Sequence, residues 1–324
     1  MGLIKKKEQV VESPYVLSKE QKRKTFLRDL KRNKQIYLLM LPLILHFLVF
    51  KYGPMYGASI AFMDYKPAKG FLASEWVGFK HFITFFKDPY FFRTIRNTLA
   101  ISTLSLIVGM PCNIIFALLI NEIANTKFKK LVQTITYLPH FISLVVICGM
   151  IQQFCSSNGV VTELFVALGM ERHNMLQDAN LFRPIYVLSG VWQGVGWGTI
   201  LYLSAISSID QEQYEAAEID GAGRFAKMRY ITLPSLLPVI TIRLILNIGN
   251  LMSVGYQKTL LLENTLTLEK AEVLGSYVYR MGLAANYPRF SYSTAVGLFE
   301  SVINIILVVT ANKVSRKVQG SGLW

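Results

Sequence analysis

Three long stretches without a charged side chain dominate this sequence. They comprise 25 residues at 97–121, 32 residues at 131–162 and 26 residues at 184–209. A helix needs about 20 apolar residues to cross a hydrocarbon core about 30 Å thick, so each stretch is long enough to span a membrane. The composition agrees, because 52% of the 324 residues are hydrophobic and the mean hydropathy is +0.37. The fold class predicted is an all-α polytopic membrane protein.

Three further apolar segments contain one charge each and are also predicted to span the membrane. Lys51 lies near the end of the first, where its ammonium group can snorkel to the interface, while Arg243 and Glu300 lie inside the last two. The six predicted spans cover about 35–57, 98–121, 131–154, 185–208, 235–257 and 292–312. An even number of spans places both termini on one side.

The distribution of basic residues predicts the orientation. The side that holds the termini carries 20 of the 34 Lys and Arg residues, and the opposite side carries 12 in longer loops. Basic residues favour the cytoplasmic side, so both termini and the loop 209–234 are predicted to be cytoplasmic. The expected organisation is a basic tail at 1–34, a membrane domain at 35–312 and a cytoplasmic tail at 313–324.

The net charge of +14 lies beside the predicted spans, where anionic lipid explains it better than nucleic acid does. Within the N-terminal tail, Ser18 and Gln21 could cap a basic helix at 19–33. A partly disordered tail is the alternative, and the sequence leaves both open.

Motifs for catalysis, metal binding or nucleotide binding are absent from the sequence. The cysteines, Cys112, Cys148 and Cys155, have no CxxC spacing, and neither GxSxG, HExxH nor a GxxxxGK[ST] phosphate loop occurs. We therefore predict a chain that is not an enzyme and carries no metal or cofactor. Any motion driven by nucleotide must come from a partner subunit.

The segment 215–234, EAAEIDGAGRFAKMRYITLP, is polar and helix-prone, and it lies between two predicted spans. Gly221 permits a sharp change of direction, and Pro234 can start the next helix because it needs no backbone donor there. Two alanines beside Glu215 would let a helix sit deep in a groove of another protein, where Glu215 could pair with a basic side chain. The segment therefore predicts a docking element.

This segment resembles the EAA loop of binding-protein-dependent ABC importer permeases. The family pattern is Glu-Ala-Ala, three residues, Gly, nine residues and Ile-x-Leu-Pro, and this chain has the same spacing. The resemblance implies coupling to an ATPase subunit through Glu215, Ala216, Ala217, Gly221, Ile231, Leu233 and Pro234.

Other segments narrow the resemblance to carbohydrate permeases. Residues 76–82, 88–92 and 97–99 are similar to the outer segment between the first two spans of that class, and 290–324 resembles the oligosaccharide and polysaccharide branch named after LplB. The resemblance implies a second homologous permease, two cytoplasmic subunits that bind ATP and Mg, and an external solute-binding protein. Members of this branch are linked to uronate-containing sugars, and this chain could be the alginate permease of a bacterial inner membrane.

Polar residues inside spans are candidates for the substrate pathway, because burying them in lipid is costly. Aromatic rings can stack on sugars or anchor at the interface, and amides can bind hydroxyls or hold helices together. Asn247, Asn250 and Ser253 are spaced to lie on one helical stripe. Gly190, Gly194 and Gly198 recur every fourth residue and predict close helix packing. The pathway candidates are Trp192, Gln193, Tyr202, Asn247, Asn250, Ser253 and Glu300.

Arg243 and Glu300 are predicted to pair across the fifth and sixth spans. At 1.5 Å per residue they lie about 12 and 18 Å from the cytoplasmic ends, within reach of long side chains. The alternative is that Glu300 faces an aqueous passage. For the chain as a whole, the rival functions are an ion-coupled secondary transporter and a membrane assembly subunit that does not transport.

Overall fold

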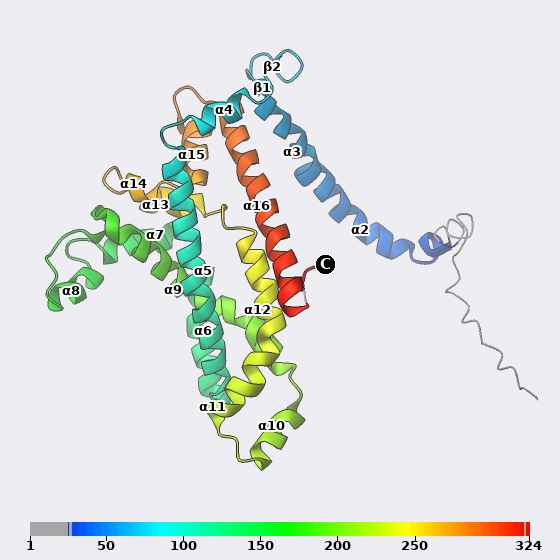
Figure 1. Cartoon of the computed structure of the whole chain (residues 1–324), viewed down its shortest axis with the longest axis vertical. Coiled ribbons are helices and arrows are strands. Elements are labelled where there is room, and N and C mark those ends of the chain that lie inside the picture. The colour runs from blue at the N-terminus through cyan, green and yellow to red at the C-terminus, as the bar shows by residue number, and fades with distance from the viewer. Residues whose placement is uncertain (1–24, 26–27, 321) are drawn as a thin grey trace, which may run out of the picture. The chain divides into compact units, whose positions relative to one another are not determined.

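The computed structural model describes residues 25, 28–320 and 322–324, and it divides into two units at 1–59 and 60–324. Most of the predicted helix at 19–33 lies outside the described residues. In the first unit, α2 (Lys34–Phe47), η1 (Leu48–Tyr52) and α3 (Gly53–Met55) follow one another (Figure 1). The next element, η2 (Tyr56–Phe62), begins in the first unit and ends in the second. None of the side chains from α2 to α3 is buried, as a helix surrounded by lipid would require.

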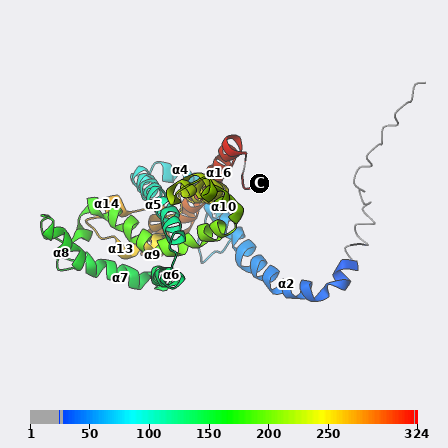
Figure 2. The ribbon, with the colours of Figure 1, turned by 90° about the horizontal axis from the view of Figure 1, so that it is seen from below.

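The second unit consists of helices and one pair of two-residue strands. Figure 1 shows α10 and α11 at one end of this unit and α4 at the other, and Figure 2 shows α7 leading away from α6 towards α8. Strands β1 and β2 pair antiparallel, with Met63 opposite Trp76. The elements are β1 (Met63–Asp64), β2 (Glu75–Trp76), α4 (Lys80–Phe86), α5 (Phe91–Asn121), α6 (Thr126–Phe141), α7 (Leu144–Phe154), α8 (Val160–Ala167), η3 (Met175–Gln177), α9 (Ala179–Ser207), α10 (Gln211–Ile219), α11 (Arg224–Lys227), η4 (Met228–Thr232), α12 (Leu233–Ile248), α13 (Tyr256–Leu262), α14 (Leu268–Ala271), α15 (Leu274–Tyr279), η5 (Arg280–Ala284) and α16 (Phe290–Gln319).

Four helices in the described part of the chain are long and apolar enough to cross a membrane. They are Lys34–Phe62, Phe91–Asn121, Arg224–Ile248 and Phe290–Val318, and a bent pair of helices, α6 and α7, brings the number to five if it counts as one span. Helix α9 covers the fourth predicted span but is not among them. The structure therefore supports a helical membrane protein with four or five apolar candidate spans.

Two predicted spans are wrong in detail. The predicted span at 131–154 is not one helix, because α6 and α7 meet at an angle of 99°. Ile142 has extended backbone after Pro139, and the Ser143 hydroxyl accepts from the Val146 N–H at 3.4 Å to start α7. The predicted span at 235–257 is also shorter, because α12 ends at Ile248.

Glycines on α9 allow close packing, but spacing alone did not identify the closest contact. A Cβ on Gly198 would lie 2.4 Å from the Asn113 side chain of α5, and one on Gly190 would lie 3.4 Å from Lys258. A Cβ on Gly194 would meet nothing within 4 Å. The closest approach is at Gly196, outside the predicted stripe, where a Cβ would lie 2.1 Å from the Thr136 carbonyl oxygen of α6.

Replacing Gly196 with alanine is expected to destabilise the membrane domain by about 2 to 3 kcal/mol, the upper part of the usual range for overpacking. The added methyl group would meet backbone, which cannot rotate away as a side chain can. Thermal unfolding of the purified transporter in detergent measures the effect. The matched control is Gly194→Ala on the same helix, which should be neutral or slightly stabilising because alanine favours helices. Equal unfolding temperatures for the two variants would contradict the contact.

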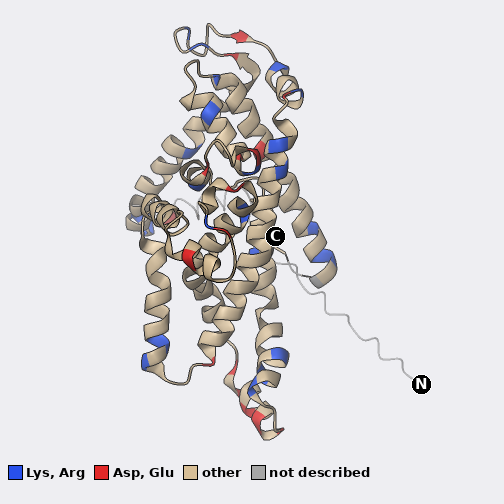
Figure 3. Ribbon diagram, turned by 90° about the vertical axis from the view of Figure 1, so that its left-hand side faces the viewer, with Lys and Arg blue, Asp and Glu red and all other residues tan. Residues whose placement is uncertain are grey.

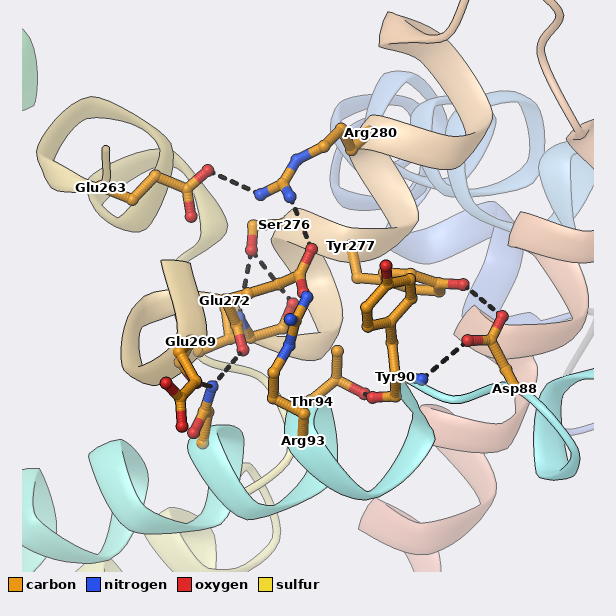
Figure 4. Close-up of polar contacts among 12 residues, drawn as sticks. Asp88, Tyr90, Arg93, Thr94, Glu263, Glu269, Glu272, Ser276, Tyr277 and Arg280 are labelled. Carbon is orange, nitrogen blue, oxygen red and sulfur yellow. Dashed lines mark hydrogen bonds and ion pairs between the residues drawn. The ribbon is translucent and has the colours of Figure 1, made fainter. Parts of the chain in front are cut away.

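Buried polar side chains tie the segment between α12 and α16 to α5. The Glu272 carboxylate, 3% exposed, accepts hydrogen bonds from Arg93 of α5 and, at 2.6 Å, from Arg280 of η5 (Figure 4). Arg280 also donates to Glu263 at 2.8 Å. Burial raises the pKa of Glu263, and the Arg280 charge opposes that rise. This network anchors residues 263–280 on α5.

A second anchor joins α15 and α16 to the residues before α5. The Tyr277 hydroxyl donates to Asp88 at 2.7 Å, and the Tyr90 N–H donates to the same carboxylate at 2.9 Å (Figure 4). The Tyr292 hydroxyl also donates to Asp88, at 2.7 Å. Burial acts to raise the pKa of Asp88, but these three hydrogen bonds and the positive charge of Arg289 together lower the pKa overall. Asp88 therefore stays ionised at neutral pH.

Candidate functional site: a coupling loop and a polar cavity

The loop between α9 and α12 contains a short helix with well-defined ends. The Asp210 carboxylate accepts from the Glu212 N–H at 3.1 Å and caps the start of α10. At the other end, the Ala222 N–H donates to the Ala217 carbonyl at 2.8 Å and the Gly221 N–H donates to the Glu218 carbonyl at 3.0 Å. These two bonds form a Schellman motif, which requires the left-handed backbone that Gly221 adopts at φ +76°.

Side chains brace α10 against the helix that follows. The Tyr214 hydroxyl lies 2.9 Å from the Thr232 hydroxyl of η4, and the Lys227 amine pairs with Glu218 at 2.5 Å. Figure 3 shows acidic and basic residues gathered in this α10–α11 region. The bracing joins α10 to the start of α12, so displacement of one is expected to move the other.

The structure places all seven predicted coupling residues within this loop and at the start of α12. Their exposure differs: Ala217 and Ile231 are half-buried, whereas Glu215, Ala216, Gly221, Leu233 and Pro234 are exposed. The loop also exposes three large apolar side chains that the sequence reasoning did not select. These are Ile219, Phe225 and Tyr230, which are 87%, 73% and 72% exposed.

A cavity of about 280 Å³ opens where α12 ends. Asn247, Asn250 and Ser253 line it as the sequence suggested, but they do not share a helical stripe, because residues 249–255 are not helical. The sequence reasoning missed the lining from α5 and α9, although Ser102 and Ser105 lie one turn apart in the first charge-free stretch. The lining residues are Ile101, Ser102, Ser105, Leu106, Tyr186, Asn247, Asn250, Leu251, Ser253, Val254 and Gly255.

Distant side chains satisfy the backbone of the non-helical segment. Ser102 of α5 donates to the Leu251 carbonyl, and the Asn304 side-chain oxygen of α16 accepts from the Met252 N–H at 3.1 Å. Non-helical backbone at membrane depth is stable only when it lines a cavity or is buried in protein, so these bonds make the cavity possible. Interruptions of this kind are where transporters commonly bind substrate.

The predicted ion pair between Arg243 and Glu300 is absent from the described part of the chain. The Glu300 carboxylate instead accepts from the Ser253 hydroxyl at 2.7 Å, and the Asn304 amide donates to the same hydroxyl at 2.9 Å. Arg243 is exposed on α12. Helix α12 ends at Ile248, and the non-helical segment after it brings Ser253 next to Glu300. Glu300 therefore bonds to Ser253 and not to Arg243.

The aromatic pathway candidates lie away from the polar cavity. Trp192 lines a separate apolar cavity of about 450 Å³ between α7, α8 and α9. Tyr202 is 1% exposed and packs with Ala117, Ile206 and other apolar residues. Gln193, half-buried on α9, does not line the polar cavity. The structure therefore brings together Asn247, Asn250 and Ser253, with Glu300 behind Ser253, and separates them from the other three.

The loop between α9 and α12 and the break after α12 lie in the part of the chain that matches a known family. Residues 109–320, which include both features, match the family of binding-protein-dependent transport system inner membrane components. The chain belongs to this family. It is therefore a permease component of an ABC-type importer in the inner membrane.

The similarity to curated relatives extends over nearly the whole length of both chains. Protein LplB of Bacillus subtilis (strain 168) is 45% identical over 93% of this chain and 94% of its own. The polygalacturonan/rhamnogalacturonan transport system permease protein YteP of the same organism is 44% identical over 95% of this chain and 96% of its own.

Solved structures show the same fold. A chain of a bacterial ABC transporter involved in the import of the acidic polysaccharide alginate is 40% identical, with a TM-score of 0.82 over 91% of this chain and 99% of that chain. A second structure of bacterial alginate ABC transporter, in complex with an alginate pentasaccharide-bound periplasmic protein, has a TM-score of 0.81 at the same identity.

Proposed function

We propose that this permease pairs with a second homologous permease to import an oligosaccharide or polysaccharide that contains uronate, such as alginate. Similarity to permeases for polygalacturonan and alginate supports this substrate class. The transporter would receive its sugar from an external solute-binding protein. Two cytoplasmic subunits that bind ATP and Mg would drive it.

The observation that carries the proposal is the braced helix α10. Its end is closed by Gly221, and Ile219, Phe225 and Tyr230 offer exposed apolar side chains to a docked subunit. Because Tyr214 joins α10 to η4, movement of a docked ATPase would be passed to α12. The far end of α12 borders the polar cavity, so the same movement would reach it. In this proposal α10 and both termini would lie in the cytoplasm, and the membrane domain 35–312 would have six spans.

The polar cavity would form part of the sugar pathway. Hydroxyl and amide side chains of Ser105, Asn247 and Asn250 line it, and such groups both donate to and accept from sugar hydroxyls. Direct hydrogen bonding to the sugar is the binding mode proposed for this cavity.

Reconstitution of the complete transporter in liposomes tests the proposal. Solute-binding protein loaded with an oligouronate should stimulate ATP hydrolysis and drive uptake of the sugar against its gradient. Uptake that needs an ion gradient but no ATP would instead indicate a secondary transporter. An assembled complex that hydrolyses ATP but takes up no saccharide would overturn the substrate class.

A further inference from the structure

A buried lysine lies next to the wall of the polar cavity. Lys258 is on α13 and only 7% exposed. Its amine donates to the Tyr186 carbonyl at 2.9 Å and lies 4.6 Å from the centre of the Tyr186 ring. Tyr186 lines the cavity, and its hydroxyl donates at 3.3 Å to Gly255, which lines it as well. Tyr186 therefore contacts both the cavity and the Lys258 amine.

This amine has no acidic partner in the part of the chain that the structure describes. The titratable groups that face it are Cys148 of α7 and Tyr186 of α9, and neither is a carboxylate. Burial lowers the pKa of Lys258 to about 8, so the amine still carries its charge at pH 7. A buried charge without a counter-charge is costly, and an anion bound nearby would offset that cost.

The cavity is electrically asymmetric. Lys258 lies behind Tyr186 on one wall, whereas the Glu300 carboxylate lies behind Ser253, to which it is bonded at 2.7 Å. An anionic group in the cavity would be attracted towards the Tyr186 wall and repelled from the Ser253 wall. Serine and amide side chains in between can bind the hydroxyls of a sugar ring in this orientation.

We propose that Lys258 determines charge specificity in this cavity by favouring sugar units that carry a carboxylate over neutral ones. The inference rests on the proposed saccharide import and assigns the acidic selectivity to one residue. The amine acts through space rather than by direct contact, because Tyr186 lies between it and the sugar. At separations of several ångströms near a protein interior, such an attraction changes binding about tenfold.

Equilibrium binding to the purified complete transporter, without the solute-binding protein, tests this role. The two probes are an oligouronate and the same oligosaccharide after its carboxylates are reduced to alcohols, so they differ only in charge. Lys258→Met should weaken oligouronate binding about tenfold and leave binding of the reduced probe unchanged. Lys258→Arg, which keeps the charge, should retain a preference for the oligouronate.

The ratio between the two probes separates charge from folding. A variant that merely packs badly would bind both probes less well by the same factor, and that result would overturn the inference. Equal binding of both probes to the unaltered transporter would overturn it too. If either result were obtained but the reconstituted transporter still took up oligouronates, the role of Lys258 would be wrong and the proposed function would stand. If the transporter took up no oligouronate, both the role of Lys258 and the proposed function would be wrong.

Discussion

Replacing Gly221 with leucine is expected to reduce ATP-driven uptake at least tenfold. Gly221 has φ +76°, a left-handed conformation that costs a residue with a side chain about 1–2 kcal/mol. A leucine would therefore open the two hydrogen bonds that close α10, from Ala222 to Ala217 and from Gly221 to Glu218. The helix would lose its fixed angle to α11, and a docked ATPase could no longer move α12. Stimulated ATP hydrolysis and uptake in liposomes measure the loss.

Gly223, two residues further along, offers a matched control. It has φ −71° and caps the start of α11, and a Cβ there would meet nothing within 4 Å. Serine is compatible with this position, so Gly223→Ser should preserve uptake. If Gly221→Leu assembled with its partners and transported normally, the coupling role of the turn would be wrong.

Replacing Glu272 with alanine is expected to destabilise the folded domain by about 3 to 5 kcal/mol, the usual result of breaking a buried ion pair. The carboxylate is 3% exposed and accepts from two guanidinium groups, those of Arg93 and Arg280. Without it, both charges would remain partly buried, and residues 263–280 would lose their anchor on α5. Thermal unfolding of the transporter in detergent measures the change.

An exposed ion pair in the same protein controls for the loss of one acidic residue. Glu163 pairs with Arg172, and their side chains are 49% and 45% exposed. Exposed pairs contribute little, so Glu163→Ala should leave the unfolding temperature unchanged. A similar small effect for Glu272→Ala would show that the buried network does not hold the segment.

Local features of this protein were predictable from sequence because their causes are local. The uncharged stretch at 97–121 appears as the long helix α5, since its length and lack of charge decide that it can lie in lipid. The spacing from Glu215 to Pro234 predicted a helix and a glycine turn, and the structure has both. The predicted restart at Pro234 is wrong, because the next helix begins at Arg224 and continues through Pro234 to Ile248. The family assignment rested on the same spacing and is confirmed.

Features that depend on contacts between distant segments were not predictable in this way. Hydropathy predicts one apolar span at 235–257, but helix α12 ends at Ile248. The alternative backbone is possible only because Ser102 and Asn304, 149 and 52 residues away from their partners, supply the missing hydrogen bonds. The same break gives Glu300 a serine partner in place of Arg243.

The sequence by itself determined that the chain is a helical membrane protein with a helix and a glycine turn between two apolar segments, because burial in lipid and backbone turns follow from neighbouring residues. The spacing within that loop also carried the resemblance to the permease family. Only the tertiary structure decided where the spans bend and break, which glycine meets a neighbouring helix, and that Lys258 lies beside the polar cavity. These features depend on which distant residues pair with the backbone groups and charges that are buried on folding. The spacing of residues along the sequence does not specify those long-range partners.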